Sequence, residues 1–307
     1  MTSSARPGSL RAWVRALRPL AHGNLAPPIL LGQALALHEG HEVSAVGFLL
    51  AHVFGVIDHA FIVLANDLAD HETDRDNTTH TLVSGGSRVV PEGLLTLEAL
   101  ARGAWIAGAA LLVLTIVAAL LLARPLAPLF ALAAIGLLLA YSHPPMRLSY
   151  RGGGEILQGL GLGAVLPLWG FYAQVGSLDR FPWIALAPVV LLHTIGNVIT
   201  ALPDAPSDAR AHKRTWPVRV GERAARGHVI ASLSAILVGF AIVIAARQTW
   251  THAALVVIAP LISLAISTRW LAHGDAAQRD ACLRFVLATA GALGLVQLGW
   301  CLALALG

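Results

Sequence analysis

Long apolar stretches recur along nearly the whole chain, and they constrain its fold more than any other feature. Of its 307 residues, 56% are hydrophobic and 12% are charged, whereas a soluble domain carries roughly 25% charged residues. A helix needs roughly 20 apolar residues to cross the hydrocarbon core of a bilayer. The sequence therefore predicts an all-α, polytopic membrane protein that forms a single domain over residues 1–307.

Nine of these stretches approach the length of a membrane span, and we expect a bundle of nine transmembrane helices. The first stretch contains Pro27 and Pro28, so its helix should be kinked or partly broken. The nine stretches are 12–37, 43–66, 97–122, 126–143, 155–176, 182–203, 226–247, 251–272 and 282–306.

The lysines and arginines predict how these helices are oriented. If nine spans alternate in direction, eighteen of the 21 Lys and Arg residues lie on the side of the amino terminus and three on the other. Cytoplasmic connections carry such an excess. We therefore expect an inner (plasma) membrane protein whose two long polar segments, 67–96 and 204–225, face the cytoplasm. The basic residues are scattered through short connections, which excludes nucleic acid as a partner and leaves the lipid bilayer.

Acidic residues gather in both long polar segments. Asp67, Asp70 and Asp74 follow the second apolar stretch at positions i, i+3 and i+7, which share one face of a helix. Asp204 and Asp208 follow the sixth stretch. Carboxylates this close together repel one another unless a cation joins them. Two aspartate-rich connections on one membrane face therefore predict an active site that binds Mg²⁺ through all five aspartates.

Basic and amide side chains beside the clusters suit a diphosphate group. Asn66 could bind it or fix a carboxylate, and Arg88, Lys213 and Arg214 are candidate contacts to its oxygens. Metal and cations would stabilise a departing diphosphate, with Asp67 and Asp208 as candidate catalytic residues. The alternative is a set of solvated charges that only mark the membrane boundary.

The clusters resemble the two aspartate-rich motifs of the UbiA superfamily of intramembrane prenyltransferases. The first motif is Asn66-Asp67-x-x-Asp70-x-x-x-Asp74, and the second is Asp204-x-x-x-Asp208 followed by Lys213-Arg214. Two further segments are similar to the branch that prenylates 1,4-dihydroxy-2-naphthoate in menaquinone biosynthesis (MenA-like). They are Gly85-Gly86-Ser87-Arg88 and the fourth connection, with Tyr141-Ser142-His143-Pro144-Pro145, Leu148-Ser149-Tyr150-Arg151-Gly152 and Glu155.

This resemblance implies a magnesium-dependent transferase that moves a prenyl group from a prenyl diphosphate to an aromatic, quinone-precursor acceptor. Two positions depart from the family pattern. His212 stands where the second motif usually has glycine, and Pro206 falls between Asp204 and Asp208. Together with Pro203, Pro206 predicts a helix break that places Asp204 near a new amino-terminal end.

Asp58 is an ionisable residue inside the second apolar stretch. It precedes Asn66 by eight residues, which places it about 12 Å deeper along a helix. It is a candidate catalytic residue that binds the acceptor or removes its proton, or alternatively it pairs with His59 or a neighbouring helix. For His193 and Asn197 we expect interhelical hydrogen bonds.

Two other functions fit parts of the pattern. Some members of the superfamily are terpene cyclases, in which the allylic cation is attacked by the substrate's own double bonds. A transporter could use the acidic residues as ion ligands, although transporters usually place ion sites near the middle of the membrane. A terpene cyclase would form products without any aromatic acceptor. A transporter would concentrate its substrate in vesicles without changing it chemically.

The orientation can be tested with single cysteines at positions 78 and 211, in a variant without Cys282 and Cys301. An impermeant thiol reagent should label both positions only from the cytoplasmic side, because the positive charge predicts one shared face. Labelling of the two positions from opposite sides would overturn this topology.

Overall fold

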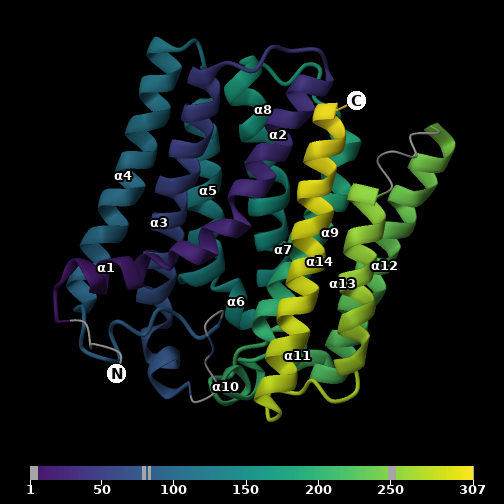
Figure 1. Cartoon of the computed structure of the whole chain (residues 1–307). Coiled ribbons are helices and arrows are strands. Elements are labelled where there is room, and N and C mark those ends of the chain that lie inside the picture. The colour runs from purple at the N-terminus through teal and green to yellow at the C-terminus, as the bar shows by residue number, and fades with distance from the viewer. Residues whose placement is uncertain (1–5, 78–80, 82–83, 248–253, 307) are drawn as a thin grey trace.

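The computed structural model describes residues 6–77, 81, 84–247 and 254–306. Within these residues all regular structure is helical, as the sequence predicts. The long helices run roughly side by side and successive ones alternate in direction (Figure 1). Helices satisfy their own backbone hydrogen bonds, which is the condition for crossing lipid.

Each of the nine apolar stretches contains at least one helix. The beginning of the stretch 251–272 lies outside the described residues. The helices of the first half are α1 (Leu10–Leu17), η1 (Pro19–Asn24), α2 (Ala26–His38), α3 (Ala45–Asp76), α4 (Leu97–Leu121), α5 (Ala127–Ser142) and α6 (Leu148–Arg151). Those of the second half are α7 (Gly154–Leu160), η2 (Gly161–Val165), α8 (Leu166–Val175), η3 (Trp183–Ala185), α9 (Leu186–Ala201), α10 (Ala205–Arg210), α11 (Trp216–Val220), α12 (Glu222–Arg247), η5 (Ala254–Ile258), α13 (Ala259–Ser267), η6 (Thr268–Trp270) and α14 (Arg279–Leu306).

Six helical segments of the described chain are long and apolar enough to cross a membrane. Two further helical segments are apolar but shorter, Ala127–Ser142 and Val256–Trp270. The first stretch is divided into α1, η1 and α2, so the expected break is confirmed. A topology of nine spans stays a prediction. The six segments are Ala45–Asp76, Leu97–Leu121, Gly154–Val175, Trp183–Ala201, Glu222–Ala246 and Arg279–Leu306.

Helix α3 is longer than its apolar stretch, which ends at residue 66. It continues to Asp76, and the guanidinium of Arg88 donates a 2.7 Å hydrogen bond to the carbonyl oxygen of Asp74 in the last turn. The same carbonyl also accepts a 3.3 Å hydrogen bond from the backbone N–H of Asn77, so both contacts cap the end of the helix. The first acidic cluster therefore lies on the final turns of a helix, and the connection itself begins at Asn77.

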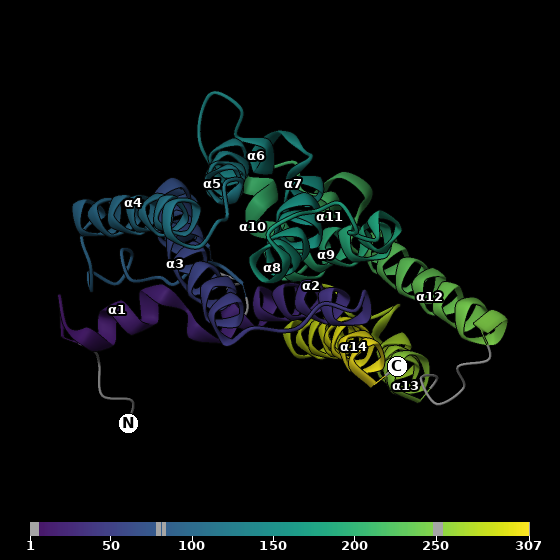
Figure 2. The ribbon, with the colours of Figure 1, turned by 90° about the horizontal axis from the view of Figure 1, so that it is seen from above.

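Close backbone contact joins α2 to α8. A Cβ atom on Gly32 would collide with the Pro167 carbonyl, and one on Gly170 would collide with the Ile29 carbonyl. Small residues of this kind let helices approach closely in lipid. Seen along the bundle, α2 lies between α3 and α14 (Figure 2), so this contact links the early helices to the last one.

Buried Arg226 fixes the start of α12 to the connection between α13 and α14. Its side chain is fully buried, and its Nε donates a 2.9 Å hydrogen bond to the Leu271 carbonyl. Its Nη1 lies 2.7 Å from Asp275 Oδ1. A buried guanidinium held by few partners makes this junction sensitive to the loss of any of them.

Replacement of Arg226 by alanine should lower the free energy of unfolding by about 3 kcal/mol, because it removes the ion pair and leaves a cavity. Thermal unfolding of the detergent-solubilised protein measures the change. Arg223→Ala is the matched control, since Arg223 is exposed on the same helix and its loss should change the stability by less than about 0.5 kcal/mol. Equal effects of the two changes would contradict this account.

Candidate active site

The two acidic clusters meet at one end of the bundle. The carboxyl-terminal end of α3 lies near α10 in Figure 1, although the two are far apart in the sequence. Asn77, just after α3, donates a 2.8 Å hydrogen bond from Nδ2 to Asp204 Oδ1. The expectation that both clusters lie on the same face of the bundle is thus confirmed.

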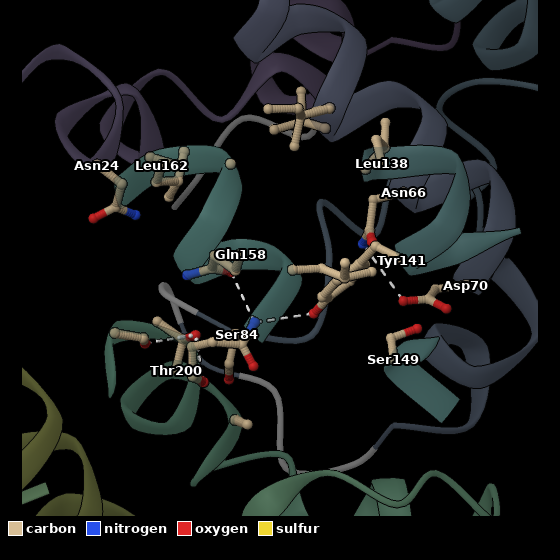
Figure 3. Close-up of a pocket in the computed structure, with 18 of the residues that line it drawn as sticks. Asn24, Asn66, Asp70, Ser84, Leu138, Tyr141, Ser149, Gln158, Leu162 and Thr200 are labelled. Carbon is tan, nitrogen blue, oxygen red and sulfur yellow. Dashed lines mark hydrogen bonds between the residues drawn. The ribbon is translucent and has the colours of Figure 1, made fainter. Parts of the chain in front are cut away.

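A cavity of about 350 Å³ opens at this meeting point and extends into the bundle between α3, α5, α7 and α9. Asn66 and Asp70 lie on one side of it, with Gln158 and Thr200 across from them (Figure 3). Polar groups surround its outer end, whereas Ala134, Leu138, Leu162 and Val165 are among the residues that line its inner part.

Lys213 lies between the two clusters. Its Nζ is 3.1 Å from Asp70 Oδ2 on α3 and 3.9 Å from Asp208 Oδ1 on α10. It also lies 4.6 Å from the centre of the Tyr150 ring, whose hydroxyl donates a 2.9 Å hydrogen bond to Asp70. Burial by itself would lower the pKa of Lys213, but Asp70 and Asp208 outweigh it and raise the pKa above its ordinary value.

The second cluster takes its geometry from a break after α9, as its prolines predict. That helix ends at Ala201, and Asp204 is the residue that precedes α10. The backbone N–H of Asp208 donates a 2.8 Å hydrogen bond to the Asp204 carbonyl, and that of Lys213 donates one of 2.8 Å to the Asp208 carbonyl. His212 has a left-handed backbone with φ of 56°, a conformation that glycine adopts without strain.

Asp208 is buried and Asp204 is partly buried. Burial raises the pKa of Asp208 to about 7, although the Lys213 ammonium draws it in the opposite direction. Burial also raises the pKa of Asp204, against the hydrogen bond from Asn77. A bound cation would offset the cost of ionising such carboxyl groups.

The first cluster is organised by residues from several segments. Ser142 Oγ donates a 2.9 Å hydrogen bond to Asn66 Oδ1, which fixes the amide beside Asp70. A Cβ atom on Gly86, whose φ is 69°, would overlap the Asp74 carboxylate. Glycine is therefore required where this loop passes over the end of α3.

Most of the predicted site residues line the cavity. They are Asp58, Asn66, Asp70, Asp74, Asp204, Asp208 and Lys213.

Asp67 is placed differently from the other predicted metal ligands. Its carboxylate accepts hydrogen bonds from Ser87 and from Arg18, the latter at 2.8 Å, and the side chain does not line the cavity. The two partners hold its oxygens on the side of α3 that faces the amino-terminal segment.

Arg88 and Arg214, two of the predicted diphosphate contacts, do not line the cavity. Arg88 donates to the carbonyl oxygens of Asp74 and Asn77 at the end of α3. Arg214 is exposed, and its backbone N–H pairs with the Tyr150 carbonyl.

Sequence reasoning missed several polar residues of the cavity. Arg18 enters it from the corner between α1 and η1, and Asn77 and Ser84 enter from the connection after α3. No feature of the sequence around Arg18 marks it as a site residue, because it is one of four arginines in an amino-terminal tail.

The expected interhelical hydrogen bonds are present. Asn197 Nδ2 lies 2.7 Å from Gln158 Oε1, and His193 Nε2 lies 3.1 Å from Gln297 Nε2.

Comparison with known proteins agrees with this geometry. Residues 25–290 match the model of the UbiA prenyltransferase family. The chain is 31% identical over 230 residues to the 1,4-dihydroxy-2-naphthoate octaprenyltransferase of Mycobacterium tuberculosis, which covers 71% of this chain and 73% of that protein. This chain belongs to the UbiA prenyltransferase family. It is therefore a prenyltransferase.

Solved structures of UbiA homologues share the fold. The homologue from Archaeoglobus fulgidus bound to DMAPP and Mg²⁺ matches with a TM-score of 0.63 at 19% identity, over 92% of this chain and 98% of that chain. The apo homologue from Aeropyrum pernix K1 matches with the same TM-score and identity, over 93% and 97% of the two chains. At such identities the likeness concerns the fold alone.

The cavity suits a hard divalent ion in the chemistry of its donors. Asp70, Asp74, Asp204 and Asp208 offer carboxylate oxygens, the ligands that Mg²⁺ prefers. No three of the described His, Cys, Asp and Glu side chains form a ready-made metal cage. Mg²⁺ commonly takes only one or two carboxylates and completes its coordination with water and substrate phosphate.

Replacement of Lys213 by methionine should lower the free energy of unfolding by about 3 kcal/mol in metal-free protein, because the buried carboxylates lose the cation that joins them. Thermal unfolding in excess chelator measures this loss. Arg214→Met is the matched control, since it removes an exposed positive charge from the next position. A loss no greater than that of the control would show that Lys213 does not hold the clusters together.

Proposed function

We propose that this UbiA family member transfers a prenyl group from a prenyl diphosphate to an aromatic acceptor, with Mg²⁺ as cofactor. The convergence of the two acidic clusters and Lys213 at the mouth of an apolar cavity carries this proposal. The polar mouth suits a metal–diphosphate group, and the apolar interior suits a prenyl chain. The relative from Mycobacterium tuberculosis supports 1,4-dihydroxy-2-naphthoate as the acceptor.

The residues at the mouth of the cavity would have two roles, metal binding and diphosphate binding. Asp70, Asp74, Asp204 and Asp208 would hold the metal, which when bound supplies positive charge that stabilises the departing diphosphate. Lys213 lies among them and would donate to diphosphate oxygens.

Asp67 would act differently from the other aspartates. Its contact with Arg18 holds that guanidinium at the wall of the cavity, where it adds positive charge. We therefore propose Asp67 as a positioning residue.

The interior of the cavity favours transfer over cyclisation. Aromatic rings are the groups that best stabilise a cation in an apolar chamber. Among the described lining residues, Tyr141 alone is a Phe, Tyr or Trp, whereas Asp58, Gln158, His193 and Asn197 are polar. Such groups suit a substrate that carries hydrogen-bonding substituents.

The acidic groups lie at one end of the bundle. A transporter usually has its ion site near the middle of the membrane, so this position does not favour transport.

The orientation follows from the charge asymmetry of the connections. We propose that the mouth of the cavity faces the cytoplasm from the inner membrane, which gives the site access to water-soluble acceptor and metal. The prenyl chain of the donor would remain in the apolar interior or in lipid.

Excess chelator should abolish product formation, and Asp208→Ala should lower kcat/KM by about 10²- to 10³-fold, because the charge that develops on the leaving group loses its stabilisation. The assay follows prenylated product by mass spectrometry with a panel of prenyl diphosphates and 1,4-dihydroxy-2-naphthoate. Asp76→Ala removes an acidic side chain that is 78% exposed and should leave the rate unchanged. Full turnover in chelator would refute the proposal.

A further inference from the structure

Asp58 is a buried carboxyl group deep in the cavity. Its residue is 2% exposed and lines the cavity from α3. Among the described residues, its Oδ1 has no hydrogen-bond partner. A buried polar atom without a partner costs free energy, so a carboxyl group in this position calls for a functional explanation.

The three candidate partners of Asp58 make contacts elsewhere, while His59 Nδ1 and Arg18 Nε have no hydrogen-bond partner among the described residues. His59, the next residue and the expected partner, has its Nε2 2.6 Å from the Leu17 carbonyl oxygen. Arg18 and Lys213, the cations that line the cavity, are paired with Asp67 and Asp70 respectively. The structural alternative, in which Asp58 is paired with His59, is thus not what the structure contains.

The partner that suits Asp58 has to come from within the cavity. A carboxyl oxygen without a donor calls for an O–H or N–H group. A prenyl chain carries neither, and a diphosphate is negatively charged and would sit about 12 Å away, at the level of Asn66. An aromatic acceptor carries ring hydroxyls on an otherwise flat apolar body, which matches a cavity lined by both apolar and polar side chains.

We propose that Asp58 accepts the hydrogen bond of a ring hydroxyl of the acceptor and so selects hydroxylated aromatic rings. The inference rests on the function proposed above and adds the residue that recognises the acceptor. With its hydroxyl at Asp58, the ring lies between this residue and the metal–diphosphate end, where it meets the reacting end of the prenyl group. Asp58 is then a substrate-binding residue that touches the acceptor and takes no part in holding the metal.

The test compares 1,4-dihydroxy-2-naphthoate with two analogues that each lack one hydroxyl, 1-hydroxy-2-naphthoate and 4-hydroxy-2-naphthoate. Loss of a hydroxyl also makes the ring less reactive, but that effect is the same in wild type and variant. The readout is the factor by which removal of a hydroxyl lowers kcat/KM. For the hydroxyl that contacts Asp58, this factor should be about 10- to 100-fold larger in the wild type than in Asp58→Leu. Asp58→Asn keeps an oxygen acceptor and should give an intermediate ratio.

The melting temperature of Asp58→Leu is a second readout. If Asp58 had a structural role, its replacement would lower the melting temperature. Because Asp58 Oδ1 has no partner among the described residues, Asp58→Leu should raise the melting temperature, by about 2–4 °C, while it weakens acceptor selection. The affinity for prenyl diphosphate and Mg²⁺ should stay unchanged. Asp76→Asn, a change of charge at an exposed position on the same helix, controls for non-specific effects on stability.

The outcomes separate the inference from the function beneath it. If the wild type makes prenylated ring and Asp58→Leu keeps the full discrimination between hydroxylated and deoxygenated rings, the role of Asp58 is overturned and the proposed function stands. A lowered melting temperature of Asp58→Leu would overturn it as well, by showing a structural partner. If the wild type consumes donor but prenylates none of the aromatic acceptors, both proposals fall.

Discussion

The contact of Lys213 with Asp70 and Asp208 is the interaction on which the rest of the site depends. It joins the end of α3 to the segment after α9, and these two acidic segments would otherwise repel each other. Burial strengthens both the repulsion and the attraction, because little water is present to screen the charges. One ammonium group thus lets the four lining carboxylates of the two clusters meet in a bundle that carries few charges.

The arginines of the site and the carboxylates that could bind a metal have different partners. Asp67 holds Arg18 at the cavity wall, and Arg88 closes the end of α3 by binding its carbonyl oxygens. The remaining carboxylates keep their oxygens toward the cavity, where a cation and a diphosphate can be accommodated together. Residues of the same motif therefore take different roles, according to the partners that each one meets.

The cavity also has a gradient of polarity that matches a two-part substrate. Charged groups lie at its mouth, apolar side chains line its interior, and a small set of polar groups remains at depth. Asn197 and Gln158 satisfy each other there, and His193 pairs with Gln297. Asp58 differs from them because its Oδ1 lacks a partner among the described residues, which is why substrate recognition falls to it.

The sequence by itself determined the all-helical membrane fold and the chemistry of the clusters. Runs of apolar residues leave helices as the available structure in lipid, and the spacing of Asp67, Asp70 and Asp74 places them on one helical face. Pro203 and Pro206 determined the helix break at Asp204, because proline disfavours the interior of a helix. Only the tertiary structure decided that Arg18 binds Asp67, that Arg88 caps the end of α3, and that Asp58 Oδ1 has no partner in the described part of the chain. These outcomes depend on which helices lie side by side, and local spacing along one chain carries no information about partners that come from distant segments.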